Sequence, residues 1–181
     1  FSLSNLTFIN TDISNSYDFQ ADNVIFKQYN NSLIHSSNGS IRISNCSFYD
    51  CFNINGGSLY IENSNMDINN SIFTSNSAGT GGAICCINSQ VILNNTVFNA
   101  NHAETMGGAL TLLNSSSILY NVSFINNTAL YNGGAIYFDD RCIVTNCNFT
   151  NNKASDGGAV YFYAEGNVTD CNFADNTANR S

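Results

Sequence analysis

The sequence predicts an all-β fold, namely a right-handed parallel β-helix (solenoid) of about eight turns with roughly 25 residues in each turn. Three observations predict it: a Gly-Gly pair recurs every 24 to 26 residues, a phenylalanine recurs once per repeat, and apolar residues within a repeat alternate with a period of two. Stacked short strands joined by polar corners satisfy all three. The right hand is expected from the general chirality of parallel crossovers.

The Gly-Gly pairs mark the regular part of the chain. They stand at residues 56–57, 81–82, 107–108, 133–134 and 157–158, and apolar residues follow each pair, as in GGAIYF. We expect one domain over residues 1–181, with shorter irregular turns over 1–40 and regular turns over 41–181. Because another Gly-Gly pair would be due just after Ser181, we expect this domain to be a segment of a longer array.

Three strands are expected in each turn: one after Gly-Gly, one ending near an asparagine column, and one that carries the phenylalanine. Residues one turn apart should then lie about 4.8 Å from each other. Asparagine can pass amide hydrogen bonds along such a stack and tolerates left-handed corners. The predicted structural ladder comprises Asn45, Asn70, Asn95, Asn121 and Asn146 with Phe73, Phe98, Phe124 and Phe149.

Composition supports this interpretation and excludes several functions. The chain has 33 asparagines, no proline and only 10% charged residues, as expected where like charges would stack and repel. With five basic and 13 acidic residues, the net charge of −8 argues against nucleic-acid binding. No apolar run of about 18 residues predicts a membrane span, so no direct membrane insertion of this segment is expected.

The motifs GGA[ILV] and FxxN resemble the repeats of chlamydial polymorphic membrane proteins. The form I-x-N-C-x-F-x-x-N-x-A is also similar to adhesin-like surface proteins of methanogenic archaea. The resemblance covers residues 41–181 well and 1–40 weakly, and it departs at Phe26, which KQY follows, and at Cys51, which replaces the asparagine. It implies a pectin-lyase-like β-helix at the extracellular cell surface that adheres to a protein or glycan of another cell, without catalytic residues or cofactors.

The strand after Gly-Gly offers the first candidate binding face. Alternation should point Leu59 and its equivalents inward and the next column outward, which comprises Tyr60, Cys85, Thr111, Tyr137 and Tyr161. The candidate binding residues are Tyr60, Tyr137 and Tyr161, because exposed tyrosines can stack on sugar rings or on a partner protein. The alternative is cross-strand packing that merely suits a sheet surface.

A second outward column holds Ile92, Ile118 and Ile143, with Tyr120 beside Ile118. Three stacked isoleucines facing water would form an apolar stripe, which is a candidate for lateral self-association. The alternative is β-propensity combined with partial cover by neighbouring side chains.

The remaining candidates are weaker. Cys147 and Cys171 share an inward column and could form a disulfide or simply fill space, and Cys85 is expected to face outward as a free thiol. The spacing Cys-x₄-Cys occurs twice, but the two histidines are out of register with it, so we expect no metal site. Sequons recur through the repeat, among them Asn5, Asn38, Asn94, Asn121, Asn126 and Asn167, and would accept glycans in a secreted protein.

The alternative functional class is a β-helical polysaccharide lyase or hydrolase. That chemistry needs a carboxylate cluster, or Ca²⁺ with a basic residue, in a groove. The best acidic pair is Asp139-Asp140 beside Arg141, in a connecting turn without matching acids in adjacent turns. A solvated corner is the simpler interpretation, so we expect a protein that is not an enzyme.

Overall fold

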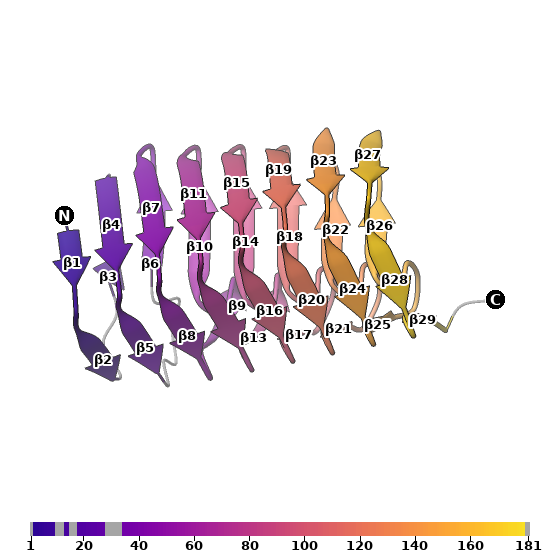
Figure 1. The fold of residues 1–181 in the computed structure, drawn as a ribbon, viewed down its shortest axis with the longest axis horizontal. Coiled ribbons are helices and arrows are strands. Elements are labelled where there is room, and N and C mark those ends of the chain that lie inside the picture. Colours follow the sequence, from indigo (N-terminus) through magenta and orange to yellow (C-terminus); the bar gives the residue numbers. More distant parts are fainter. Residues whose placement is uncertain (1, 10–12, 15–17, 28–33, 180–181) are drawn as a thin grey trace.

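The computed structural model describes residues 2–9, 13–14, 18–27 and 34–179. Every regular element in this part of the chain is a β-strand, and neighbouring strands pair in parallel. In Figure 1, one sheet descends on the near side and another rises on the far side while the chain advances from the N- to the C-terminal end. This is a right-handed parallel β-solenoid, so the predicted fold class is confirmed.

Four sheets form the sides of the solenoid, and we name them A to D. Sheet A contains β1 (Ser2–Ser4), β4 (Asp18–Asp22), β7 (Ser40–Ser44), β11 (Asn65–Asn69), β15 (Gln90–Asn94), β19 (Ser116–Tyr120), β23 (Cys142–Thr145) and β27 (Gly166–Thr169). Sheet B contains β2 (Thr7–Ile9), β5 (Ile25–Lys27), β8 (Ser47–Tyr49), β12 (Ile72–Thr74), β16 (Val97–Asn99), β20 (Ser123–Ile125), β24 (Asn148–Thr150) and β28 (Asn172–Ala174).

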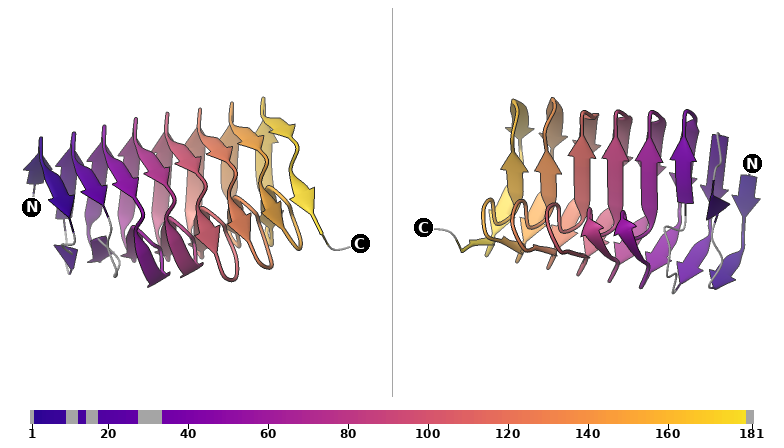
Figure 2. Two further views of the ribbon diagram at one scale, coloured as in Figure 1. Left: turned by 90° about the horizontal axis from the view of Figure 1, so that it is seen from below. Right: turned by 180° about the vertical axis from the view of Figure 1, so that it is seen from behind.

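The other two sheets complete each turn. Sheet D contains β9 (Phe52–Asn55), β13 (Ser77–Thr80), β17 (His102–Ala103), β21 (Thr128–Ala129), β25 (Lys153–Ala154) and β29 (Thr177–Ala178). Sheet C contains β3 (Ile13–Ser14), β6 (Ile34–Ser37), β10 (Leu59–Glu62), β14 (Ile84–Ile87), β18 (Leu110–Leu113), β22 (Ile136–Phe138) and β26 (Val160–Phe162). Figure 2 shows these sides from below and from behind.

The expectation of three strands per turn is wrong, because sheet D adds a fourth. Its strands lie where F-x-x-N-x-A ends, and most of them are two residues long, too short to show an alternating pattern. Sheets A and B have eight strands each and sheet D has six, so six turns are regular within the described residues and two shorter N-terminal turns precede them. The predicted eight turns counted both kinds.

Phenylalanines stack continuously along the core. Phe98 pairs in register with Phe73 on one side and Phe124 on the other, and the ring centroids are 4.9 and 5.1 Å apart. The stack continues from Phe26 to Phe173 with nearly parallel rings. Phe73, Phe98, Phe124 and Phe149 are fully buried. Each turn therefore presents the same apolar surface to the next.

Residues with left-handed backbone form the corners. Asparagine holds this conformation between sheets C and A, for example Asn88 at φ 51°, and between sheets A and B, for example Asn95 at φ 48°. The first glycine of each pair holds it before sheet C, as at Gly107 with φ 63°. The second glycine allows close approach, since a Cβ on Gly108 would lie 2.0 Å from the carbonyl oxygen of Gly134.

A buried asparagine ladder runs along the corner between sheets B and D. It comprises Asn76, Asn101, Asn127, Asn152 and Asn176, which are the asparagines of FxxN. Asn101 Nδ2 donates to Asn127 Oδ1 at 2.9 Å and to the carbonyl oxygen of Phe73 at 3.0 Å, while Asn101 Oδ1 accepts from Nδ2 and from the backbone N–H of Asn76. These bonds satisfy polar groups that the corner buries.

The predicted ladder of Asn45, Asn70, Asn95, Asn121 and Asn146 lies elsewhere, at the exposed corner between sheets A and B. Asn121 Nδ2 donates to Asn95 Oδ1 at 2.7 Å, and Asn146 Nδ2 donates to Asn121 Oδ1 at 3.4 Å. Asn45 Nδ2 donates to Asp22 instead. This column mainly supplies left-handed backbone, and the continuous ladder belongs to the FxxN column.

Candidate binding surfaces on sheets A and C

The tyrosine column lies in register on the outer face of sheet C. Tyr137 and Tyr161 are neighbours, with parallel rings whose centroids are 5.5 Å apart, and both are half-buried. Burial is the main cause that raises the pKa of Tyr137 above its ordinary value. Tyr60 stands three turns away, with Cys85 and Thr111 between. The structure therefore brings two of the three predicted tyrosines together.

Cys85 is not the exposed thiol that its outward position predicts. Its exposed fraction is 1%, because the glycine turns that enter sheet C pack against this column. A Cβ on Gly81 would lie 3.2 Å from Cys85 Cα, and one on Gly107 would lie 2.2 Å from Thr111 Oγ1. Desolvation raises the pKa of Cys85 to about 12, so the thiol stays protonated and poorly reactive.

Tyr60 belongs to a separate small cluster. Its ring lies 4.9 Å from that of His35, and its hydroxyl donates to Glu62 Oε1. Glu62 Oε2 lies 3.5 Å from His35 Nε2. These contacts occupy the tyrosine hydroxyl, so Tyr60 is less available to a partner than its place in the column predicts.

The isoleucine stripe is continuous on the outer face of sheet A. Ile92, Ile118 and Ile143 occupy paired register positions in three successive turns and are 40, 47 and 41% exposed. A shallow hollow of about 270 Å³ lies along them and is also bordered by Arg141. Tyr120 is half exposed on the same face. The predicted residues therefore do form one apolar surface.

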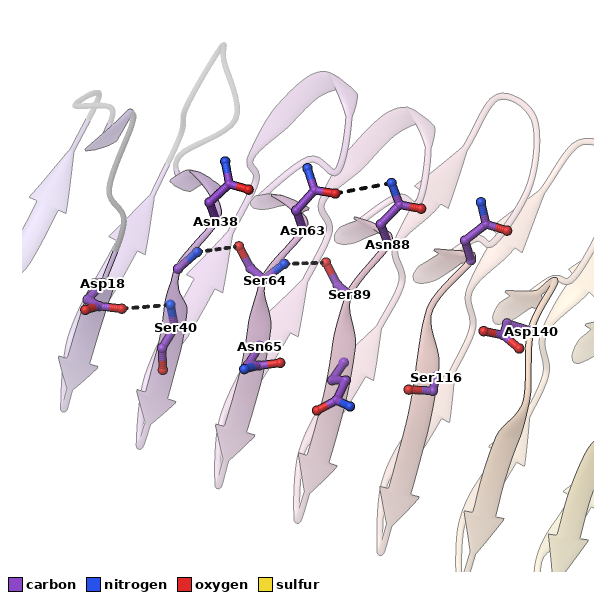
Figure 3. A pocket seen from close by; sticks show the side chains of 13 residues that line it. Asp18, Asn38, Ser40, Asn63, Ser64, Asn65, Asn88, Ser89, Ser116 and Asp140 are labelled. Carbon is purple, nitrogen blue, oxygen red and sulfur yellow. Dashed lines mark hydrogen bonds between the residues drawn. The ribbon is translucent and has the colours of Figure 1, made fainter.

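A larger groove, which the sequence did not reveal, runs beside this stripe at the corner between sheets C and A (Figure 3). Its volume is about 950 Å³, and amides and hydroxyls line most of it. One row consists of the left-handed corner asparagines Asn38, Asn63, Asn88 and Asn114. The other row consists of the first outward residues of the sheet A strands, which are Ser40, Asn65, Gln90 and Ser116. We call it the amide groove.

In the described part of the chain, no three His, Cys, Asp or Glu side chains are grouped to hold a metal ion. Asp139 accepts a hydrogen bond from the backbone of Asn114, and Asp140 accepts one from the backbone of Arg141. Both carboxylates thus stabilise a corner. Among the segments that the structure describes, none is a helix that could cross a bilayer.

The seven cysteines all carry free thiols. Cys147 and Cys171 do share a column, and the backbone N–H of Cys147 donates to Cys171 Sγ at 3.3 Å. Earlier turns of the same column place a serine or threonine hydroxyl at this position, as at Ser71 and Thr96. In this structure, these two cysteines fill the role of small corner residues.

The repeat of the Chlamydia polymorphic membrane protein family matches three stretches of the chain, residues 70–87, 121–139 and 146–163. The repeats are similar to those of chlamydial polymorphic membrane proteins. The matched stretches together cover less than half of the chain. No curated protein and no solved structure matches it.

The three matches cover the same part of a turn. Each begins at the corner asparagine after sheet A, continues through sheets B and D, and ends in or just after sheet C. The matched stretches therefore include Phe73, Phe124 and Phe149 of the Phe stack, with their FxxN asparagines and three of the glycine pairs. The strands of sheet A lie outside them, and so do the isoleucine stripe and the amide groove.

Proposed function

We propose that this chain is a non-catalytic segment of a surface-displayed adhesin or stalk, which presents a binding face to a protein or glycan of another cell. The observation that carries the proposal is the combination of the chlamydial-type repeat with a regular solenoid. Such a rod holds each displayed side chain at a fixed height along its axis. Surface display and extracellular location are part of the same proposal.

The interior supports a mechanical role. The Phe stack and the FxxN ladder join each turn to the next through buried contacts. Because every turn contacts only its neighbours, stability and stiffness belong to the array rather than to one turn. A rod of this kind can project a binding face away from its point of attachment.

Beads coated with the chain should attach to target cells, and attachment tests the proposal. Changing both Tyr137 and Tyr161 to Ala should weaken attachment several-fold, because their paired rings supply flat apolar surface. Tyr131→Ala, at a tyrosine that is 56% exposed between sheets D and C and outside the tyrosine column, is the matched control. Absence of attachment by the unmodified chain would overturn the proposed function, and unchanged attachment by the double variant would remove these tyrosines from it.

Lateral self-association through the isoleucine stripe is the second part of the proposal. Ile118→Glu should lower the fraction of dimer measured by analytical ultracentrifugation, because it places a charge in the middle of the apolar surface. Ile72→Glu, at a similarly exposed isoleucine on sheet B, is the control. Equal association by both variants would contradict a role for the stripe.

A further inference from the structure

We infer that the amide groove binds a neutral, hydroxyl-rich polysaccharide chain that lies parallel to the solenoid axis. The inference rests on the proposed adhesive function and names the ligand class and a site outside the tyrosine and isoleucine surfaces. Its basis is the groove at the corner between sheets C and A, which holds two parallel rows of amides and hydroxyls (Figure 3).

The corner backbone leaves the amides available. The backbone N–H of Asn63 donates to the carbonyl oxygen of Ile87, and that of Asn88 donates to the carbonyl oxygen of Leu113. Within the described residues, one hydrogen bond joins side chains of this row, from Asn88 Nδ2 to Asn63 Oδ1 at 3.3 Å. Each asparagine side chain has two N–H donors and one oxygen that can accept two hydrogen bonds. Most of these donors and acceptors in the row are therefore available to a ligand in the groove.

The floor of the groove holds both rows in place. Ser64 Oγ accepts from the backbone N–H of Gly39 and donates to the carbonyl oxygen of Glu62. Ser89 Oγ does the same one turn later, accepting from Ser64 and donating to Ile87. Because these hydroxyls are already satisfied, the corner is fixed before any ligand arrives, which lowers the ordering cost of binding.

The regular spacing favours a polymer over a small molecule. Equivalent amides recur once per turn, about 4.8 Å apart along the axis. A chain with repeating hydroxyls can therefore meet an equivalent set of partners at each turn. Every added sugar unit should strengthen binding until the groove is filled, because the contacts act as linked sites.

Charge selects the class of polysaccharide. Among the described residues that line the groove, none is Lys or Arg, and Asp18 and Asp140 stand at its two ends. Arg42 and Arg141 border the neighbouring hollows on sheet A instead. With a net charge of −8 for the chain, the groove disfavours an acidic polysaccharide. The neighbouring Ile92 and Ile118, which border the groove beyond Gln90 and Ser116, offer apolar surface to the carbon-bound faces of the sugar rings.

The test measures binding of the whole chain to three soluble polymers by affinity electrophoresis: an α-mannan, a β-glucan and polygalacturonate. We expect at least one neutral polymer to bind and polygalacturonate not to bind. Oligosaccharides of that polymer should bind more tightly with increasing length and then reach a plateau. Binding of neither neutral polymer, or binding of polygalacturonate as tight as that of a neutral one, would overturn the inference.

Matched variants locate the site. Asn63→Gly together with Asn88→Gly removes two amides while glycine keeps the left-handed backbone, so binding should weaken about tenfold. Asn126→Gly with Asn151→Gly makes the same change at exposed left-handed corners of another side and should leave binding unchanged. Asn65→Ala with Gln90→Ala provides a second test in strand positions if the glycine pair does not fold.

Equal binding by the groove variants and the unmodified chain would contradict the assignment. Cell attachment separates this result from failure of the proposed function. A chain that attaches to cells but binds no neutral polymer leaves the adhesive role standing and removes the groove ligand. A chain that attaches to nothing removes the adhesive role itself.

Discussion

At the scale of single residues, asparagine has two distinct uses in this protein. At exposed corners such as Asn95, its main contribution is tolerance of left-handed backbone. In the FxxN column, its amide is buried and satisfies backbone groups of the preceding turn, as at Asn101. Substitution should therefore lower stability much more in the FxxN column than at an exposed corner. Only in the FxxN column does loss of the amide leave buried polar groups without hydrogen-bond partners.

Asn101→Ala should destabilise the protein strongly. The change leaves the backbone N–H of Asn76 and the carbonyl oxygen of Phe73 without their side-chain partner in a site with no solvent exposure. We expect a loss of about 3 kcal/mol or more, measured as a shift of the urea unfolding midpoint. Asn121→Gly, at an exposed corner with φ 54°, should cost less than about 1 kcal/mol. Equal losses for both would contradict the distinction.

Buried thiols should make the fold sensitive to alkali. Burial raises the pKa of Cys85 and of Cys142 to about 12, from an ordinary value of 9.0. The unfolded chain therefore ionises these thiols at lower pH than the folded protein does, and the stability they contribute below pH 9 is lost as pH rises toward about 12. The urea midpoint should fall across this range.

The cysteine variants provide the control for that prediction. Cys85→Ala combined with Cys142→Ala should make the dependence of the urea midpoint on pH less steep between about pH 9 and 12. A midpoint that is constant over this range in the unmodified protein would argue that the thiols are not buried as the structure shows.

The residue scale also shows where the sequence is informative. Cys85 shares a register column with the half-buried Tyr60, but its own burial depends on how close the turns at Gly81 and Gly107 come to sheet C. That distance is a property of the folded corner. Similarly, the FxxN asparagines were visible as a column, yet nothing in the sequence distinguishes a buried column from an exposed one.

At the scale of strands and sheets, the ring stack is the simplest contact between turns. Phe98 is fully buried with a ring on each side. Ile72, beside Phe73 on a strand of the same sheet, is 40% exposed. The two residues therefore compare a buried apolar side chain with a half-exposed one on sheet B.

Phe98→Ala should lower stability by about 3–5 kcal/mol, since it removes a buried ring and leaves a cavity between two turns. Ile72→Ala should cost about 1–2 kcal/mol, because 40% of this residue is already exposed to water. Denaturant unfolding followed by circular dichroism measures both. A loss for Ile72→Ala as large as that for Phe98→Ala would contradict the burial of the ring stack.

Element boundaries were predictable where alternation is long enough to detect. The strands of sheets A and C run for three to five residues in the regular turns, and their inward and outward columns follow from the sequence. Sheet D was missed because strands such as Thr128–Ala129 have two residues and follow directly after a corner. The amide groove was missed for another reason, since its two columns lie only two positions apart in each turn and nothing in the sequence shows that the folded corner leaves a hollow along them.

At the scale of the whole molecule, the turn is the repeating unit, and the sheets that form its sides have different roles. Sheets B, D and C carry the repeat signature and the buried contacts that hold the turns together. Sheet A carries an outer face that this signature does not specify, with an apolar stripe and a polar groove side by side.

The register of the turns is the central claim, and contacts between phenylalanine rings test it most directly. With phenylalanine selectively labelled, NMR should show a chain of ring-to-ring nuclear Overhauser effects from Phe73 through Phe98 and Phe124 to Phe149, whose centroids lie 4.9–5.1 Å apart. The Phe98→Leu variant should lose the signals of one ring, which assigns those signals to Phe98 and orders the rings on either side of it. Absence of an effect between Phe98 and Phe124 in the folded protein would contradict the stacked register and the surfaces built on it.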